Sequence, residues 1–198
     1  MPKQVDHQQR RGQIAEAVCR LAGREGLDAV SLRQVAAEAG VSMGRVQHYF
    51  TTKDEMLLFA FQAISERVER RIAAAVAGIG ENPSARDAVR ALLRELLPLS
   101  ESARAEAPVL VAFLARAVVE PGIAEPLRAG GVGLQELLAE QIRSASGDVD
   151  ATREAVSLLA LVDGLMPQVL IGQIDAGAAA AALDYQLDRI FGGSPRAR

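Results

Sequence analysis

The sequence predicts an all-α protein of about nine helices, in which a small N-terminal three-helix domain precedes a larger helical domain. Apolar residues recur every three or four positions along most of the chain, which is the spacing of one helix face. No segment alternates apolar and polar residues for long enough to indicate a strand. Hydrophobic residues make up 49% and charged residues 24% of the chain, so a buried core can form and disorder throughout is excluded.

The first helix is marked by a single apolar stripe. Ile14, Val18, Leu21 and Ala22 follow the helical spacing of three to four residues. Gly26 comes after them and predicts the end of the helix.

Two short helices are expected next. Ser31 is placed to cap the first of them, and Gly40 can adopt the left-handed backbone conformation that ends it. Ser42 is placed to cap the second. Val46 and Phe50 lie four residues apart and therefore share the inward face of this second short helix.

Thr52 is placed to cap a long fourth helix over about 53–77, with carboxylates in its first turn. Glycine and proline residues then divide the rest of the chain into five further helices. These expected helices cover about 84–98, 107–119, 134–144, 150–174 and 178–191, and residues 193–198 are expected to form a disordered tail.

Several classes of function are excluded by what the chain contains. Cys19 is the only cysteine and there are two histidines, so a disulfide, a cysteine-based metal cluster and a zinc site are not expected. The sequence has no phosphate-binding loop, zinc-protease motif or nucleophile elbow, so we expect neither an enzyme nor a cofactor. No apolar run approaches the ~18 residues of a membrane span and no secretory signal is present, which predicts a cytoplasmic protein.

Positive charge is concentrated at the N-terminal end. Residues 1–53 hold eight Lys and Arg against five Asp and Glu, a net charge of +3. Residues 54–198 hold fourteen against twenty, a net charge of −6. A basic module on an acidic body favours a polyanionic partner, although a charge of +3 alone is weak evidence.

The segment 31–53 has the pattern of a helix-turn-helix, in which the second helix enters the major groove of DNA. Residues 39–57, AGVSMGRVQHYFTTKDEML, resemble the AGVSkgtlYhYFksKeeLl signature of the TetR family of transcription factors. A helical interaction module without DNA binding would leave the exposed cluster of Arg45, Gln47 and His48 unexplained.

The resemblance implies a homodimeric regulator, most commonly a repressor, that reads a palindromic operator. Residues 10–55 would form the DNA-binding domain, with the helix-turn-helix at about 32–51. Residues 56–192 would bind a small-molecule effector and form the dimer, and the helix at about 53–77 would connect the two domains.

The same resemblance assigns roles to individual residues of the helix-turn-helix. It implies phosphate contacts near the two capping serines and Lys53, base contacts in the second helix, and backbone contacts at its end, where Tyr49 could equally be a core residue. The expected DNA-binding residues are Ser31, Arg33, Ser42, Met43, Gly44, Arg45, Gln47, His48, Tyr49 and Lys53. Gln47 stands where the family most often has tyrosine, and a glutamine can make a bidentate contact with adenine. Arg10 and Arg11 either contact phosphate or belong to a solvated helix face.

The C-terminal part offers candidates for ligand binding and dimerisation. Only three aromatic residues follow residue 78, so we expect a largely apolar ligand rather than a quaternary ammonium held in an aromatic cage. The expected apolar walls of the ligand site, most of which core packing explains equally well, are Leu97, Leu110, Phe113, Leu114, Leu138, Leu159, Val162 and Met166. Arg116, Asp163 and Gln168 are expected to orient the ligand, although Asp163 could instead pair with an arginine across the dimer. The segment 155–174 is apolar on nearly every side, which predicts that a partner chain covers it. The expected dimer residues are Leu158, Leu161, Leu165, Val169, Leu183, Leu187 and Ile190.

Overall fold

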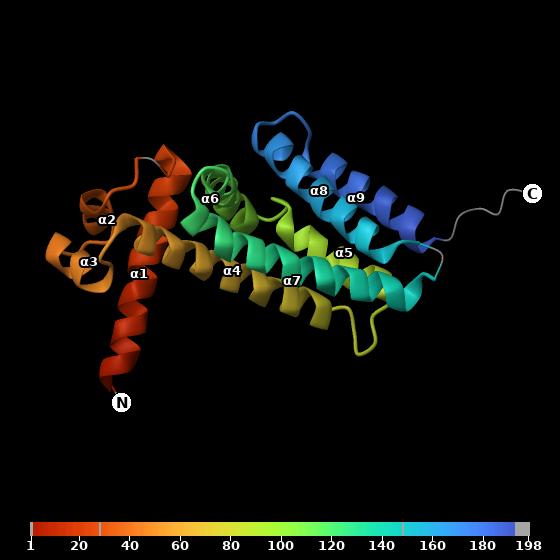
Figure 1. Cartoon of the computed structure of the whole chain (residues 1–198), viewed down its shortest axis with the longest axis horizontal. Coiled ribbons are helices and arrows are strands. Elements are labelled where there is room, and N and C mark those ends of the chain that lie inside the picture. The colour runs from red at the N-terminus through yellow and green to blue at the C-terminus, as the bar shows by residue number, and fades with distance from the viewer. Residues whose placement is uncertain (1, 28, 148, 193–198) are drawn as a thin grey trace, which may run out of the picture. The chain divides into compact units, whose positions relative to one another are not determined.

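The computed structural model describes residues 2–27, 29–147 and 149–192, and these ranges contain nine α-helices and no strand (Figure 1). The helices are α1 (Pro2–Glu25), α2 (Leu32–Glu38), α3 (Met43–Tyr49), α4 (Lys53–Ala77), α5 (Ala85–Leu96), α6 (Glu101–Ala117), α7 (Pro121–Ala145), α8 (Ala151–Leu170) and α9 (Ala176–Phe191). The expected all-α class is confirmed. The tail expected at residues 193–198 lies outside the described residues.

The helix starts expected from capping residues are confirmed by hydrogen bonds. Each capping side chain accepts the backbone N–H of the residue three positions later, which satisfies one of the donors that a helix start leaves without a partner. These caps, with their N–H donors, are Ser31 with Gln34 (3.3 Å), Ser42 with Arg45 (3.3 Å), Thr52 with Glu55 (3.1 Å), Ser84 with Asp87 (3.1 Å) and Asp150 with Arg153 (3.2 Å). Gly40 has a φ of 65°, so α2 is followed by the expected left-handed residue.

Two helices are longer than the sequence predicted, and each runs through a proline. α6 begins at Glu101 rather than near residue 107, because Ser100 accepts the N–H of Ala103 and caps it. Pro108 lies inside α6 and Pro126 inside α7, which begins at Pro121 rather than near residue 134. A proline inside a helix removes one hydrogen bond. The buried residues Ala107 and Val109 beside Pro108 supply packing that offsets this loss, whereas Pro126 lies in a largely exposed part of α7.

α8 is shorter than predicted. It ends at Leu170 rather than near residue 174, because Gly172 adopts a left-handed conformation with a φ of 74°. The N–H groups of Gly172 and Gln173 then donate to carbonyls of the last turn of α8, at Val169 and Gln168. This closing pattern satisfies the carbonyls that the helix end leaves free.

The chain divides into two compact units. The first consists of the residues up to Arg67 together with Pro108–Glu125, and the second consists of Val68–Ala107 together with the residues from Pro126 onward. The boundary between these units lies inside α4, and the segment 108–125 of α6 and α7 groups with the N-terminal residues.

The N-terminal unit is built around the predicted apolar stripe of α1. Ile14, Val18, Leu21 and Ala22 are all buried, and α1 contacts α2, which in turn contacts α3. Within the same unit the ring of Phe61 in α4 packs against that of Phe113 in α6, with 5.2 Å between ring centroids.

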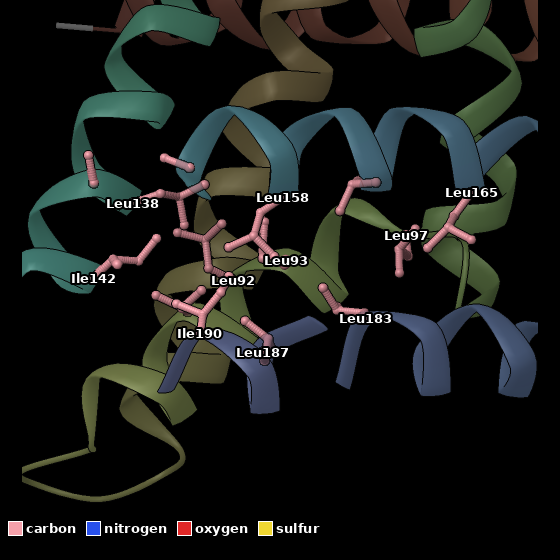
Figure 2. Packing of buried hydrophobic residues seen from close by; sticks show 14 of the residues in the cluster. Leu92, Leu93, Leu97, Leu138, Ile142, Leu158, Leu165, Leu183, Leu187 and Ile190 are labelled. Carbon is pink, nitrogen blue, oxygen red and sulfur yellow. The ribbon is translucent and has the colours of Figure 1, made fainter. Parts of the chain in front are cut away.

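The C-terminal unit buries the inner faces of α5, α7, α8 and α9 in one hydrophobic core (Figure 2). Leu92 and Leu93 of α5, and Leu97 directly after it, lie in one cluster with Leu158 and Leu165 of α8, with Leu183, Leu187 and Ile190 of α9, and with Leu138 and Ile142 of α7. α8 and α9 lie side by side and both contact α5.

Ion pairs join α5 to α9 at the edge of this core. Arg90 donates from Nε to Oδ1 of Asp184 (2.6 Å), and Arg86 pairs with Asp188 one turn away. The hydrogen bond from Arg90 holds the pKa of the Asp184 carboxyl below its usual range. The two pairs lie one helical turn apart on both helices, so they set the register of α5 against α9.

In the described part of the chain, no single helix has both the length and the apolar character needed to cross a membrane. α6 and α7 meet the length and composition criteria only as a pair bent by 118°.

Candidate nucleic-acid interface

α3 has a buried side and an exposed side. Val46 is buried within the helix, and Phe50, which ends it, is only 1% exposed. The opposite side carries the expected base-reading residues and is exposed. Its exposed residues are Ser42, Met43, Gly44, Arg45, Gln47 and His48. α3 therefore presents most of the predicted contacts on one continuous surface.

The remaining predicted DNA contacts lie around α3. Arg33 is exposed on α2, and Ser31, which caps α2, is half-buried. Tyr49 is half-buried and its ring lies edge-on to that of His48, with 5.3 Å between centroids. Half-burial fits both functions considered for Tyr49, because a tyrosine can bury its ring and keep its hydroxyl group in water. Lys53 is half-buried at the first position of α4.

α1 and α2 are joined by two arginines on one glutamate. Glu38, near the end of α2, accepts hydrogen bonds from Arg24 (2.9 Å) and Arg20 (2.7 Å) of α1. These hydrogen bonds, the one from Arg24 first, lower the pKa of Glu38 from 4.5 to about 2. The ion pairs thus tie α2, against which α3 packs, to the helix that carries the core of this unit.

The start of α4 is connected to α6 by an arginine that the sequence placed in the ligand site. Arg116 donates to Oδ1 of Asp54 in the first turn of α4 (3.2 Å) and to Oε1 of Glu120 (2.8 Å). Its side chain is only 16% exposed. Arg116 therefore has two carboxylate partners, one of which lies in the turn of α4 that begins at Lys53.

The other predicted ligand residues of the N-terminal unit do not share one environment. Phe113 is buried against Phe61, Leu110 is half-buried and Leu114 is exposed.

In the C-terminal unit, the predicted ligand residues fall mainly in or near the core. Four of them are buried: Leu97, Leu138, Val162 and Met166. Leu159 and Gln168 are half-buried. Asp163 lies on the exposed side of α8 rather than in the enclosed position that the sequence indicated, and partial removal of its carboxyl from water raises the pKa of Asp163.

A hollow of ≈ 400 Å³ lies beside the turn between α8 and α9, and it is lined by none of the predicted ligand residues. Its lining residues are Arg104, Val169, Leu170, Gly172, Ile174, Asp175 and Ala176.

The predicted dimer residues lie mainly in the core of the single chain. Leu158, Leu165, Leu183, Leu187 and Ile190 are buried, and Leu161 and Val169 pack against the same core. This placement differs from the expectation, because side chains that fill a chain's own core have no surface left for a second chain.

Comparison with known proteins identifies the fold. A family model described as bacterial regulatory proteins of the tetR family matches residues 14–59, and one described as the C-terminal part of BetI-type transcriptional repressors matches residues 85–192. The chain belongs to the TetR family of transcriptional regulators. It is therefore a regulator with an N-terminal helix-turn-helix and a helical C-terminal domain, and not an enzyme.

Individual relatives agree with this assignment. The chain is 34% identical to the transcriptional regulator PksA of Bacillus subtilis over 88% of this chain and 85% of that protein. It is 30% identical to the transcriptional regulator BetI of Burkholderia thailandensis over the full length of both.

Two solved structures have the same fold. A transcriptional regulator from Rhodococcus sp. Rha1 superposes with a TM-score of 0.84 at 32% identity, covering 95% of this chain and 99% of that one. A transcriptional regulator from Saccharomonospora viridis, solved in complex with choline, superposes with a TM-score of 0.75 at 26% identity, covering 93% and 96%.

The two-arginine contact predicts a specific dependence of stability on pH. Because the pKa of Glu38 is about 2 in the folded chain and 4.5 ordinarily, its ion pairs stabilise the fold fully above pH 4.5 and are lost as the pH falls toward 2. Glu38→Gln removes the carboxylate. We expect the melting temperature of the wild type to exceed that of Glu38→Gln at neutral pH, and this difference to shrink below pH 4.5.

The measurement is a thermal melt of both chains between about pH 6 and pH 3. Glu136→Gln, which removes one carboxylate from an exposed position of α7, is the control. A wild-type advantage over Glu38→Gln that stays constant across this range would contradict the two-arginine contact.

Proposed function

We propose that the protein is a cytoplasmic repressor that binds a palindromic operator as a homodimer and is released by a small, largely apolar ligand. The observation that carries the DNA part is the exposed side of α3, where Gln47, Arg45 and His48 stand together on a helix whose other side is buried. In this proposal, residues 10–55 form the DNA-binding domain and 56–192 the effector and dimer domain. A dimer places its two recognition helices about 34–36 Å apart, on successive major grooves.

Base recognition and binding to the phosphate backbone are assigned to different residues. Gln47 is exposed in the middle of α3, whereas Lys53 begins α4 beside the expected backbone contacts. Gln47→Ala is expected to reduce discrimination at one base pair per half-site by about 1–3 kcal/mol and to leave binding to scrambled DNA nearly unchanged. Lys53→Ala is expected to weaken binding to both DNAs alike. It is also expected to reduce the slope of log K against log salt concentration by about one for each phosphate contact removed.

The experiment first selects duplexes from a random pool with the wild-type chain, and then titrates each variant against the selected and a scrambled duplex at three salt concentrations. The proposal fails if Gln47→Ala weakens both duplexes equally while Lys53→Ala changes only the preferred sequence. In that case α3 faces away from the bases.

The dimer is proposed to form through the outward sides of α8 and α9. On α8 these carry Val156, Ala160 and Gly164, and on α9 they carry Ala181 and Tyr185, all of which are exposed in the single chain. Val156 is 48% and Tyr185 68% exposed, so apolar surface remains open on two adjacent helices. The small residues let a second pair of helices approach closely, which supports a four-helix bundle between two chains.

A charge on this surface is expected to separate the dimer. Ala160→Glu adds a carboxylate close to Asp163, and at a contact between chains it would be buried without a partner. We expect a dimeric mass for the wild type and a monomeric mass for Ala160→Glu in sedimentation at micromolar concentration. Ala129→Glu, the same change at an exposed position of α7, is expected to remain dimeric. A monomeric wild type, or a dimeric Ala160→Glu, would exclude this interface.

The effector is proposed to act through α4. This helix begins at Lys53, where Arg116 contacts its first turn, and extends to Ala77 in the other compact unit. A ligand that binds better to the form of the protein unable to hold the operator shifts the equilibrium toward that form. Asp163 and Gln168 remain the polar groups proposed to orient the ligand in an otherwise apolar site.

The apolar character of the effector can be tested with choline, the ligand bound by the Saccharomonospora relative. Choline is commonly held by aromatic rings, and this chain has only Phe113, Tyr185 and Phe191 after residue 78. We expect a saturating concentration of choline to leave operator affinity unchanged in a mobility-shift titration. Release of the operator by choline would overturn the apolar-effector proposal.

A further inference from the structure

Arg11 of α1 lies over two aromatic rings at once. Its guanidinium carbon is 4.3 Å from the ring centroid of Phe59 and 5.1 Å from that of Phe50. The two rings are themselves in contact, with centroids 5.4 Å apart and planes tilted by 49°. These distances are within the range over which a cation is attracted to the face of an aromatic ring.

One ring belongs to the end of α3, the proposed DNA-reading helix, and the other belongs to α4, which follows it. Phe50 ends α3, where its N–H donates to the carbonyl of Val46 (2.9 Å), and Phe59 lies in α4 six residues after Lys53. Arg11 therefore connects α1 with the last turn of α3 and the first part of α4. α3 has only seven residues and packs mainly against α2, so its end at Phe50 is the place where α1 and α4 contact it through Arg11 and Phe59.

Stability alone does not explain an arginine at this position. The Nε atom of Arg11 is buried and has no hydrogen-bond partner. A buried donor without a partner is unfavourable, and a methionine or leucine would fill the same space without one. What an arginine adds is a flat cation that can lie on both ring faces, which the compact ammonium group of a lysine cannot reproduce.

We propose that Arg11 is a positioning residue for operator recognition. Its guanidinium group, stacked on Phe50 and Phe59, holds α3 in the direction that lets Gln47 and its neighbours reach the base edges. Arg11 thereby sets the discrimination between the operator and other DNA without touching a base. This inference rests on the proposed DNA-binding function of α3.

The test compares variants that separate charge, flatness and ring contact. Arg11→Met keeps an apolar stem and removes the cation, and Arg11→Lys keeps the charge and removes the flat group. Phe59→Leu removes one ring face and leaves Arg11 in place. Arg10→Met removes the same charge from the adjacent position of α1 and is the control. Affinities for the duplex selected by the wild type and for its scrambled version are measured at three salt concentrations, and melting temperatures are recorded beside them.

We expect Arg11→Met to reduce the ratio of selected to scrambled affinity by roughly three- to tenfold. Arg11→Lys should reduce this ratio nearly as much, although the charge is kept. Phe59→Leu should act in the same direction, and the double variant Arg11→Met with Phe59→Leu should be no worse than Arg11→Met alone, because both changes break the same stack. Arg10→Met should leave the ratio at the wild-type value.

Three results would overturn the proposal. Arg11 would be a phosphate contact if Arg11→Met weakened affinity for both duplexes equally, if the slope of log K against log salt became smaller by about one, and if Arg11→Lys restored the affinity. If Arg11→Met and Phe59→Leu lowered the melting temperature but left the ratio of selected to scrambled affinity unchanged, the contact of Arg11 with the two rings would contribute to stability only. If the wild type selects no sequence from the pool, the DNA-binding function itself fails, whereas a selected operator with an unchanged ratio in the variants removes only the function of Arg11.

Discussion

A helix of seven residues is not stable by itself in water, and the N-terminal unit is organised around holding one in place. α3 obtains its start from the Ser42 cap and its end from Phe50, and its only inward side chain within the helix is Val46. Because these contacts use one side of the helix, the other side carries residues that packing does not need. One side of this short helix therefore packs against the rest of the unit, and the opposite side carries the residues proposed to contact DNA. Arg11 lies over the ring of Phe50, and this is the contact through which we propose that it sets the direction of α3.

The C-terminal unit shows a comparable division on a larger scale. α8 and α9 use their leucines against α5 and α7, and the ion pairs of Arg86 and Arg90 hold α9 in register on α5. The sides turned away from this core carry alanine, glycine and larger apolar residues such as Val156 and Tyr185, together with charged residues such as Arg153, Asp163 and Arg189. Such a surface gives little to the stability of one chain, which is why its composition fits an association between chains better than it fits contact with water.

Arg116 illustrates how a charged residue in an apolar helix can have partners that its neighbours in the sequence do not indicate. In the folded chain its partners are Glu120, four residues later, and Asp54, 62 residues earlier. The pairing at Asp54 joins α6 to the first turn of α4 inside one compact unit. Arg116 therefore contacts the same helix turn that begins with Lys53.

The sequence by itself determined the all-α class, the capped helix starts, the buried stripe of α1 and the DNA-reading segment. These are local properties, since a cap, a helix period or a left-handed glycine depends on residues within one or two turns. Tertiary structure alone decided that α6 continues through Pro108, because packing of the buried residues beside it offsets the lost helical hydrogen bond. It also decided which side of α8 and α9 the chain keeps for its own core, and it placed the guanidinium group of Arg11 over Phe50 and Phe59. When a helix is apolar on two sides, its own sequence does not indicate which neighbouring element will cover each side. That outcome depends on the packing of the whole chain.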